Sequence, residues 1–425
     1  MSDANACPEY RSLSRRQFVS GASMMAAATL LPGIAPRIAF AQSTSVKDTV
    51  ILIQLRGGAD PLTFCPPHGD PIYYQARPTL AIPQPNSGHL DAAIDLDGYF
   101  GFAKSFEPLM TAFQDGNLGV INAVGRANWT RSHFDAQNWM QTDTLALNQG
   151  GWLSRHLASS EQVDLNAPFR GLTFTSATPL VLSRVGQVTA VNNVDNFHMN
   201  ANFPDDQLVQ DTLRRIYSRV RDETRDIVRD SSRAINSIAS LNVSGYSSSA
   251  GTPYPDSYIG KSLKSTAAMI KAEVGVEVLC IDKHGWDTHG NQGSRSGVLA
   301  NMMTDLANSL AAFYADMEAA GKTNWTIVVM SEFGRQIEEN GSLGTDHGTG
   351  GTMLTIGPNV IGGVHVDWPG LEMENRYDGV DLAPTKDYRD VLGDLVQCRL
   401  QNGNTDYVFP SRIIPNEPLG YFEAA

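Results

Sequence analysis

Short apolar runs rich in β-branched residues recur along the chain and have the length of strands. They cover residues 48–55, 117–124, 275–282, 324–331 and 352–357. Each run is almost continuously apolar instead of alternating with polar positions, which is typical of strands that are covered on both faces. The pattern therefore predicts the strands of a buried sheet.

Amphipathic helical patterns lie between several of these runs. Apolar residues recur at three- and four-residue steps from Phe102 to Phe113, and residues 296–321 are rich in helix-favouring residues up to Gly321. Strands that alternate with amphipathic helices indicate a mainly parallel sheet with helices on both faces. We therefore expect an α/β fold.

Residues 160–257 interrupt this alternation. Apolar positions keep a helical rhythm from 205 to 241, and a stretch rich in serine, glycine and proline follows. We interpret 160–257 as an insertion between sheet strands, partly β and partly helical. On this interpretation, residues 42–425 form a single domain.

Residues 1–41 resemble a twin-arginine (Tat) export signal. Arg15 and Arg16 are adjacent, an apolar stretch runs from 19 to 31, and a small-x-small cleavage motif ends at Ala41. The apolar stretch is roughly a dozen residues, whereas a bilayer-spanning helix needs about 20. We expect the Tat machinery to export the protein, and cleavage to leave a periplasmic or secreted chain with no stable membrane span.

Charge and cysteine content exclude some classes of function. The formal net charge is −13 at pH 7, so nucleic acid, which is itself negatively charged, is not an expected partner. Cys65, Cys280 and Cys398 are widely spaced and form no C-x-x-C motif, which argues against a haem or iron–sulfur protein. Small buried hydrophobic residues are the simplest interpretation of Cys280 and Cys398.

Ionisable and hydroxyl residues collect in the loops at the ends of the predicted strands. Ligands of open α/β sheets bind beyond the carboxyl ends of the strands, so we expect these residues to share one cleft. The alternative is a series of ordinary polar loops. The candidate site residues are Asp60, Ser132, His133, Asp287, His289, Glu332, Arg335 and His347.

Local spacing indicates the role of several candidates. Asp287 and His289 are two residues apart, so in an extended segment both side chains point to the same side and can bind one metal ion. Asp346 and His347 are adjacent and point in opposite directions, so we expect Asp346 to orient a ligand from behind. Asp60 has an alternative role as a helix N-cap.

Ser132 has two interpretations. It lies where a helix is expected to begin, with Asp135 three residues later, which is the spacing of an approximate capping box. A helix N-terminus also stabilises developing negative charge, so the same hydroxyl could attack phosphorus or sulfur as a nucleophile.

Several stretches together resemble the DUF1501 family of exported bacterial proteins, over nearly the whole chain after the export signal. They are "LRGGADPL", "RSHFDAQNWMQT", "HGWDTHGNQ", "MSEFGR" and "GTDHGTGGTMLTIG". That family is similar in fold to the alkaline phosphatase and sulfatase superfamily. The resemblance implies a central sheet with metal-binding Asp and His residues on loops beyond the strands.

The resemblance also assigns roles to residues. It implies Asp60, Asp287, His289, Glu332 and His347 as metal ligands, and Ser132, or less favourably Thr130, as the nucleophile. The sequence departs from the superfamily pattern at Phe333, which stands where a histidine usually helps to bind a second metal. Phe333 therefore favours one bound ion over two.

We therefore expect an exported metal-dependent hydrolase of phosphate or sulfate esters, or of related oxyanion esters. About one divalent ion per chain, such as zinc or manganese, would polarise the ester oxygen and stabilise either the Ser132 alkoxide or a hydroxide. Arg335 or Arg131 would bind the anion, and His133 would act on the leaving group. The alternative is a non-catalytic phosphatase-like protein that binds a partner or an envelope glycan, which Phe333 would favour.

Overall fold

The computed structural model describes residues 48–126, 130–144, 150–162, 167, 170–175, 177–184, 188–191, 241 and 243–424. The expected export signal and, apart from residue 241, the helical pattern of 205–241 lie outside these residues. No helix in the described ranges combines the length and apolar character needed to cross a membrane.

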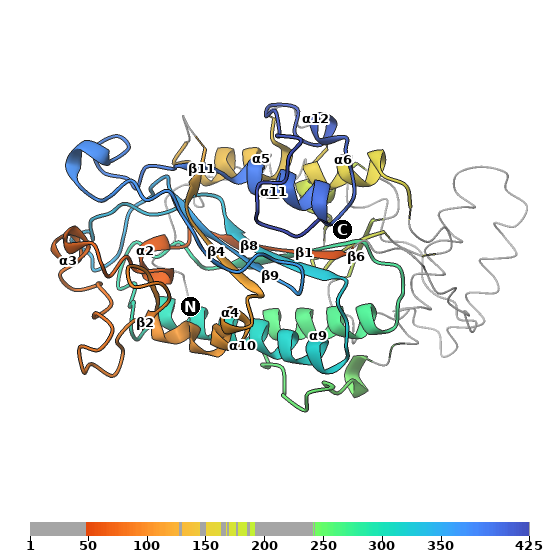
Figure 1. Cartoon of the computed structure of the whole chain (residues 1–425), viewed down its shortest axis with the longest axis horizontal. Coiled ribbons are helices and arrows are strands. Elements are labelled where there is room, and N and C mark those ends of the chain that lie inside the picture. The colour runs from red at the N-terminus through yellow and green to blue at the C-terminus, as the bar shows by residue number, and fades with distance from the viewer. Residues whose placement is uncertain are drawn as a thin grey trace, which may run out of the picture.

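Nine strands in this part of the chain form one mixed sheet (Figure 1). Their order is β10-β4-β9-β8-β1-β7-β5-β6, and β11 also pairs with β4. All pairs are parallel except those of β9 with β4 and with β8. The predicted α/β class with a mainly parallel sheet is confirmed. The strands are β1 (Thr49–Arg56), β4 (Leu118–Gly125), β5 (Gly171–Thr173), β6 (Val188–Ala190), β7 (Val278–His284), β8 (Trp325–Ser331), β9 (Gly351–Ile356), β10 (Gly363–His365) and β11 (Lys386–Asp387).

Helices cover both faces of the sheet, with α4, α9 and α10 on one side and α5, α6, α11 and α12 on the other (Figure 1). Alternate residues of β1 pack into two separate cores: Ile51 and Ile53 face one, and Val50 and Leu52 face the other. This explains why Val50 to Ile53 are apolar without interruption. The helices are α2 (Pro61–Phe64), α3 (Pro71–Ala76), α4 (Met110–Gln114), α5 (His133–Thr142), α6 (Trp152–Ser159), α9 (Tyr258–Lys271), α10 (Val298–Ala319), α11 (Tyr388–Cys398) and α12 (Thr405–Val408).

Shorter elements complete the described structure. The hairpin of β2 (Ile94–Asp95) and β3 (Gly101–Phe102) is antiparallel. The predicted helix at 102–113 is divided: Phe102 belongs to β3, and the 3₁₀ helix η2 (Lys104–Leu109) precedes α4. Pro108 lies inside η2, where its ring and missing N–H disfavour a regular α-helix. The other 3₁₀ helices are η4 (Leu180–Leu182), η6 (Val243–Gly245) and η7 (Met373–Asn375).

The antiparallel direction of β9 follows from the connection that precedes it. Parallel neighbours need a long crossover, usually a helix, whereas residues 332–350 between β8 and β9 contain no helix. The chain therefore turns back, and β9 begins at the edge of the sheet where β8 ends. This brings the residues just before β9 close to the residues just after β8.

The described part of 160–257 contributes to the same sheet. β5 pairs in parallel with β7, and β6 pairs with β5 at the end of the sheet. The remainder of the expected insertion lies largely outside the described residues. Cys65, Cys280 and Cys398 are buried free thiols.

Candidate functional site

Four loops meet at the carboxyl edge of the sheet. They follow β1, β4, β7 and β8. Glycines permit their close approach: Gly57 and Gly58 have φ angles of +127° and +71°. A Cβ at Gly57 would collide with the backbone nitrogen of Asp287, and one at Gly58 would lie 2.5 Å from the ring of Phe333. The bare backbone after β1 therefore lets the loops after β7 and β8 pack against it.

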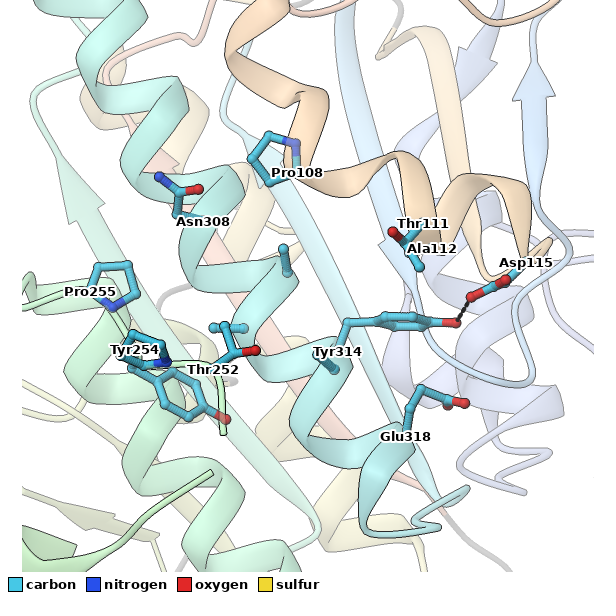
Figure 2. Close-up of a pocket in the computed structure, with 14 residues that line it drawn as sticks. Pro108, Thr111, Ala112, Asp115, Thr252, Tyr254, Pro255, Asn308, Tyr314 and Glu318 are labelled. Atoms are coloured by element: carbon cyan, nitrogen blue, oxygen red, sulfur yellow. Dashed lines mark hydrogen bonds between the residues drawn. The ribbon is translucent and has the colours of Figure 1, made fainter. Parts of the chain in front are cut away.

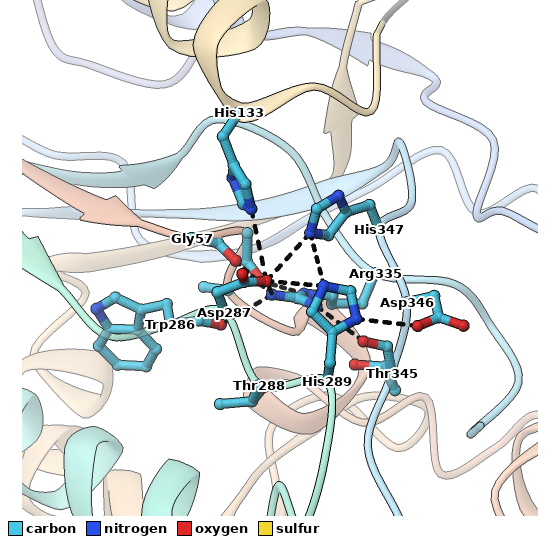
Figure 3. A network of polar contacts seen from close by, with 12 residues as sticks. Gly57, His133, Trp286, Asp287, Thr288, His289, Arg335, Thr345, Asp346 and His347 are labelled. Carbon is cyan, nitrogen blue, oxygen red and sulfur yellow. Dashed lines mark hydrogen bonds and ion pairs between the residues drawn. The ribbon is translucent and has the colours of Figure 1, made fainter. Parts of the chain in front are cut away.

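The loops bring three imidazoles around one carboxylate oxygen (Figure 3). Nε2 of His289 and Nε2 of His347 lie 3.0 and 3.1 Å from Oδ1 of Asp287, and Nε2 of His133 lies 3.5 Å from it. The Nε2 atoms of His289 and His347 are 2.9 Å apart. Within the described chain, His133, Asp287 and His347 offer ligand atoms that all lie within 4.8 Å of one another.

The other nitrogen of each ring is also engaged. Nδ1 of His133 lies 2.8 Å from Oε1 of Glu332, and Nδ1 of His289 lies 2.9 Å from Oδ1 of Asp346. Nδ1 of His347 lies 2.8 Å from the backbone oxygen of Arg131. Because each of these oxygens accepts a hydrogen bond, we place a hydrogen on Nδ1 in every ring.

The donor set fits a divalent metal ion. With hydrogen on Nδ1, the Nε2 lone pairs face a carboxylate and one another, which is repulsive unless a proton or a metal cation lies between them. Ligand bonds of about 2.1 Å separate neighbouring ligand atoms by about 3.0 to 3.4 Å, close to the observed 2.9 to 3.5 Å. His133, Asp287 and His347 could therefore hold such an ion. Nε2 of His289 lies within 3.0 Å of the ligand atoms of Asp287 and His347.

The electrostatics of the cluster favour positive charge. In the metal-free protein, burial alone would raise the pKa of Asp287, but its contacts with His133, His289 and His347 and the charge of Arg335 lower it well below its usual range. Burial alone would lower the pKa of His133, but its hydrogen bonds to Asp287 and Glu332 raise the pKa to about 9. In the metal-free protein, the His133 ring is therefore protonated on both nitrogens and positively charged at neutral pH.

Glu332 lies behind His133, in contact with several hydrogen-bond donors. Its Oε1 accepts hydrogen bonds from His133, from the backbone nitrogen of Gly57 and from Nε2 of Gln137, each at 2.8 Å. Its Oε2 accepts a bond from the Ser331 hydroxyl. Burial raises the pKa of Glu332, but His133 and Gln137 outweigh this effect and lower it to about 2. The structure thus places this predicted ligand where it orients a histidine.

Asp60 is not brought to the cluster. It is completely buried, and its Oδ2 accepts hydrogen bonds from Arg77, Thr63 and Gln292 at 2.5 to 2.7 Å. Burial raises its pKa, but Arg77 outweighs this effect and lowers it. Oε1 of Gln292 also accepts bonds from the hydroxyls of two residues that flank the cluster, Thr288 and Thr345. Asp60 therefore supports the site loops from a distance.

Arg335 is also a buried structural residue. Its guanidinium donates to the backbone oxygens of Gly57, Gly58, Trp286 and Thr345 and, at 2.8 Å, to Oδ1 of Asp287. With its side chain fully buried, it offers no surface to a substrate anion. Its position holds three loops together.

Arg131 remains accessible beside the cluster. Its side chain is 39% exposed and bonds to Asp381, with Asp378 3.5 Å away. Of the two predicted anion-binding arginines, the structure thus leaves Arg131 partly open to solvent.

Ser132 occupies the N-cap position of α5, directly before His133. Its backbone is extended, with φ −83° and ψ 122°, but its side chain makes no capping hydrogen bond. The hydroxyl of Thr130 instead accepts a bond from the backbone nitrogen of Ser132 at 3.1 Å. The capping role expected for a serine at this position is therefore not performed by its hydroxyl.

Phe333 fills space beside the histidines. Its ring centroid lies 4.9 Å from that of His133 and 4.8 Å from that of His347, and the residue is 3% exposed. An apolar ring here supplies no ligand.

A separate groove of about 690 Å³ lies along α10 (Figure 2). Residues of α10, the η2–α4 segment and the stretch 252–255 line it, including Pro108, Tyr254 and Tyr314. None of the predicted site residues line this groove. It is a different feature from the histidine cluster.

Several solved structures are similar to this chain at low sequence identity. Similar solved structures are the alkaline phosphatase from the Antarctic bacterium TAB5 (12% identity, 75% of this chain, 94% of that one, TM-score 0.30) and the phosphonate monoester hydrolase of Agrobacterium radiobacter (10%, 88%, 79%, 0.29). A third is Ps i-CgsB in complex with k-i-k-neocarrahexaose (10%, 86%, 73%, 0.30).

TM-scores this low carry no argument about function. No curated protein matches the chain. Residues 264–388 match the family described as "Protein of unknown function (DUF1501)". The resemblance to the DUF1501 family is thus confirmed for the segment that carries Asp287, His289 and His347.

Proposed function

We propose that this chain is an exported metal-dependent hydrolase of phosphate or sulfate esters, or of related oxyanion esters. The observation that carries the proposal is the convergence of three imidazole Nε2 atoms on Oδ1 of Asp287. Structural polar loops rarely direct several lone pairs at one point, because such a cluster destabilises the fold unless a cation compensates it.

The residues have distinct tasks in this proposal. His133, Asp287, His289 and His347 hold one ion, and their nitrogen-rich set suits zinc, manganese or a similar transition ion. When bound, the ion supplies Lewis-acid chemistry that polarises the ester oxygen. Phe333 excludes water from one side of the two histidines that it contacts.

Ser132 is the nucleophile in this proposal, and Thr130 is the less favoured alternative. Because the Ser132 hydroxyl makes no capping bond, it is available for attack, and the N-terminus of α5 stabilises the negative charge that develops on it. Arg131, which is partly exposed, is placed to contact the substrate anion, whereas buried Arg335 positions Asp287.

The competing function is a non-catalytic protein that binds an envelope glycan or another partner. Phe333 favours it, because one hydrophobic ring replaces a potential metal ligand. Elemental analysis of protein purified without chelators, followed by a panel of phosphatase, phosphodiesterase and sulfatase substrates, separates the two functions. Stoichiometric metal with ester turnover supports the hydrolase, and absence of both supports the binding protein.

Export is tested at the arginine pair. Changing Arg15 and Arg16 together to lysine should abolish most export, because Tat signals are recognised through this pair and not through positive charge alone. Cell fractionation measures the exported share. Arg11→Lys is the matched control and should export normally. Unchanged export of the double variant would contradict Tat targeting.

Metal binding should depend on pH through His133. Its pKa of about 9 in the metal-free protein means that the ion must displace a proton at neutral pH. The apparent affinity should therefore rise with pH, by up to about tenfold per unit between pH 7 and 9, and level off above this range. Calorimetric titration with Zn²⁺ in two buffers of different ionisation enthalpy measures the released proton.

Glu332→Gln provides the control for this pH effect. The change removes a carboxylate that raises the pKa of His133, so fewer protons should be released at pH 7.5 than in the wild type. Equal proton release by both proteins would contradict the assignment of the displaced proton to His133.

A further inference from the structure

A buried carboxylate beside the cluster joins two of the segments that carry its histidines. Asp381 has no exposed surface, and its Oδ2 accepts hydrogen bonds from Nε and Nη2 of Arg131 at 3.1 and 2.8 Å. The same oxygen accepts a bond from the hydroxyl of Thr349 at 2.7 Å. One oxygen atom thus connects the loop before α5 to the loop before β9.

Both partners of Asp381 lie next to the proposed ligands. Arg131 is two residues before His133, and Thr349 is two residues after His347. The backbone oxygen of Arg131 also accepts the hydrogen bond from Nδ1 of His347 at 2.8 Å. The guanidinium contact with Asp381 therefore restrains the residue whose carbonyl sets the orientation of the His347 ring.

The segment that carries Asp381 is itself anchored. Residues Tyr377 and Asp381 exchange two backbone hydrogen bonds of 3.0 Å, and Ile337 donates to the backbone oxygen of Val380 at 3.1 Å. The carboxylate therefore extends from a fixed backbone. A rigid anchor can transmit position to the two loops that it holds.

Stability alone gives little reason for this arrangement. Removing the Asp381 carboxylate from water costs free energy that its attraction to the partly exposed Arg131 often does no more than offset. Asp381 also leaves its buried Oδ1 without a hydrogen-bond partner among the described residues, which adds to that cost. A role in positioning the neighbouring loops accounts for the Asp381–Arg131 pair.

We propose that Asp381 is a positioning residue of the metal site, which holds the His133 and His347 loops in register through Arg131 and Thr349. This inference rests on the metal site of the proposed function. Loss of the Asp381 contacts leaves the ligands present but misaligned, so it weakens metal binding without changing the ligand set.

The test compares Asp381→Asn with Asp48→Asn in the full chain after removal of metal. Asp48 is the matched control: it is equally buried, pairs with Arg399 and accepts a bond from Thr326, but it lies at the start of β1, away from the cluster. Both variants remove the charge of a buried carboxylate that is paired with an arginine, so both should melt at lower temperature. Only Asp381→Asn should weaken Zn²⁺ binding, by about 10- to 100-fold.

Two further variants cover the case in which Asp381→Asn does not fold. Thr349→Val removes one donor to Asp381 and should also weaken Zn²⁺ binding, though less. Asp378→Asn alters a 65% exposed carboxylate 3.5 Å from the same arginine and should leave binding unchanged. Equal Zn²⁺ affinity of Thr349→Val and the wild type would overturn the inference, as would equal affinity of a folded Asp381→Asn.

Failure of this inference is distinguishable from failure of the proposed function. If the wild type binds no metal, the proposed metal site fails, and the inference fails with it. If the wild type binds Zn²⁺ and His347→Ala loses most of the binding while Asp381→Asn keeps the wild-type affinity, only the role of Asp381 is overturned. All these measurements use metal affinity and melting temperature and need no substrate.

Discussion

Replacing Asp287 with alanine is expected to remove nearly all bound metal. Its Oδ1 is the atom that His133, His289 and His347 face, and it accepts a 2.8 Å bond from buried Arg335. Without the carboxylate, the guanidinium charge remains beside the ion's position with no compensating anion, and breaking such a pair costs about 3 kcal/mol or more. Elemental analysis should show a fall from about one ion per chain to less than about a tenth, together with loss of turnover.

Two further variants provide metal contents with which that of Asp287→Ala can be compared. His347→Ala removes a proposed ligand and should also lose most of the metal. Asp346→Ala removes no proposed ligand: it removes the 2.9 Å contact to Nδ1 of His289 and a 3.1 Å bond from Asn340, from a side chain that is 51% exposed. It should therefore lose less metal. Full metal retention in both Asp287→Ala and His347→Ala would indicate that residues 332–350 form an ordinary polar loop and not part of a metal site.

Changing Ser132 to alanine is expected to reduce turnover by about a thousandfold or more, as for the loss of other catalytic nucleophiles. Metal content should stay at the wild-type level, because the hydroxyl is not among the proposed ligands. Stability should change little, since the side chain makes no capping bond. A capping serine would instead cost about 1 kcal/mol on the same change. Initial rates and denaturant unfolding of one variant measure both quantities.

Thr130→Ala is the control for the nucleophile. Its hydroxyl accepts one bond from the Ser132 backbone, so its loss should reduce turnover only modestly. If Thr130→Ala abolishes turnover while Ser132→Ala does not, the nucleophile is the threonine. If neither change matters, water attacks the ester directly, and the role assigned to Ser132 is wrong.

The strands of the central sheet follow from the sequence alone. Residues buried on either face of a sheet are mostly apolar, so Val50 to Ile53 form an unbroken apolar run that marks β1. The same reasoning located β4, β7, β8 and β9, each within a few residues of its observed bounds. The position of the site at the carboxyl edge follows from the parallel class of the sheet.

Short-range geometry at the site was also accessible from the sequence. Asp287 and His289 lie two residues apart in extended chain, and their side chains do meet, at 3.0 Å. Asp346, expected to point away from the ion, contacts the outer nitrogen of a histidine. It orients His289 instead of its neighbour, because the approach of the two loops decides the partner.

Tertiary structure alone decided which partner each remaining charged group obtains. Glu332 meets His133 across 199 residues, and Asp60 meets Arg77 and Gln292 at full burial. Residue type and local spacing determine only that a carboxylate stands at the end of a strand. Whether it faces an ion, an arginine or an imidazole depends on which donors lie within about 3 Å once the loops have packed. That competition is settled by contacts between segments far apart in the chain, which no local pattern encodes.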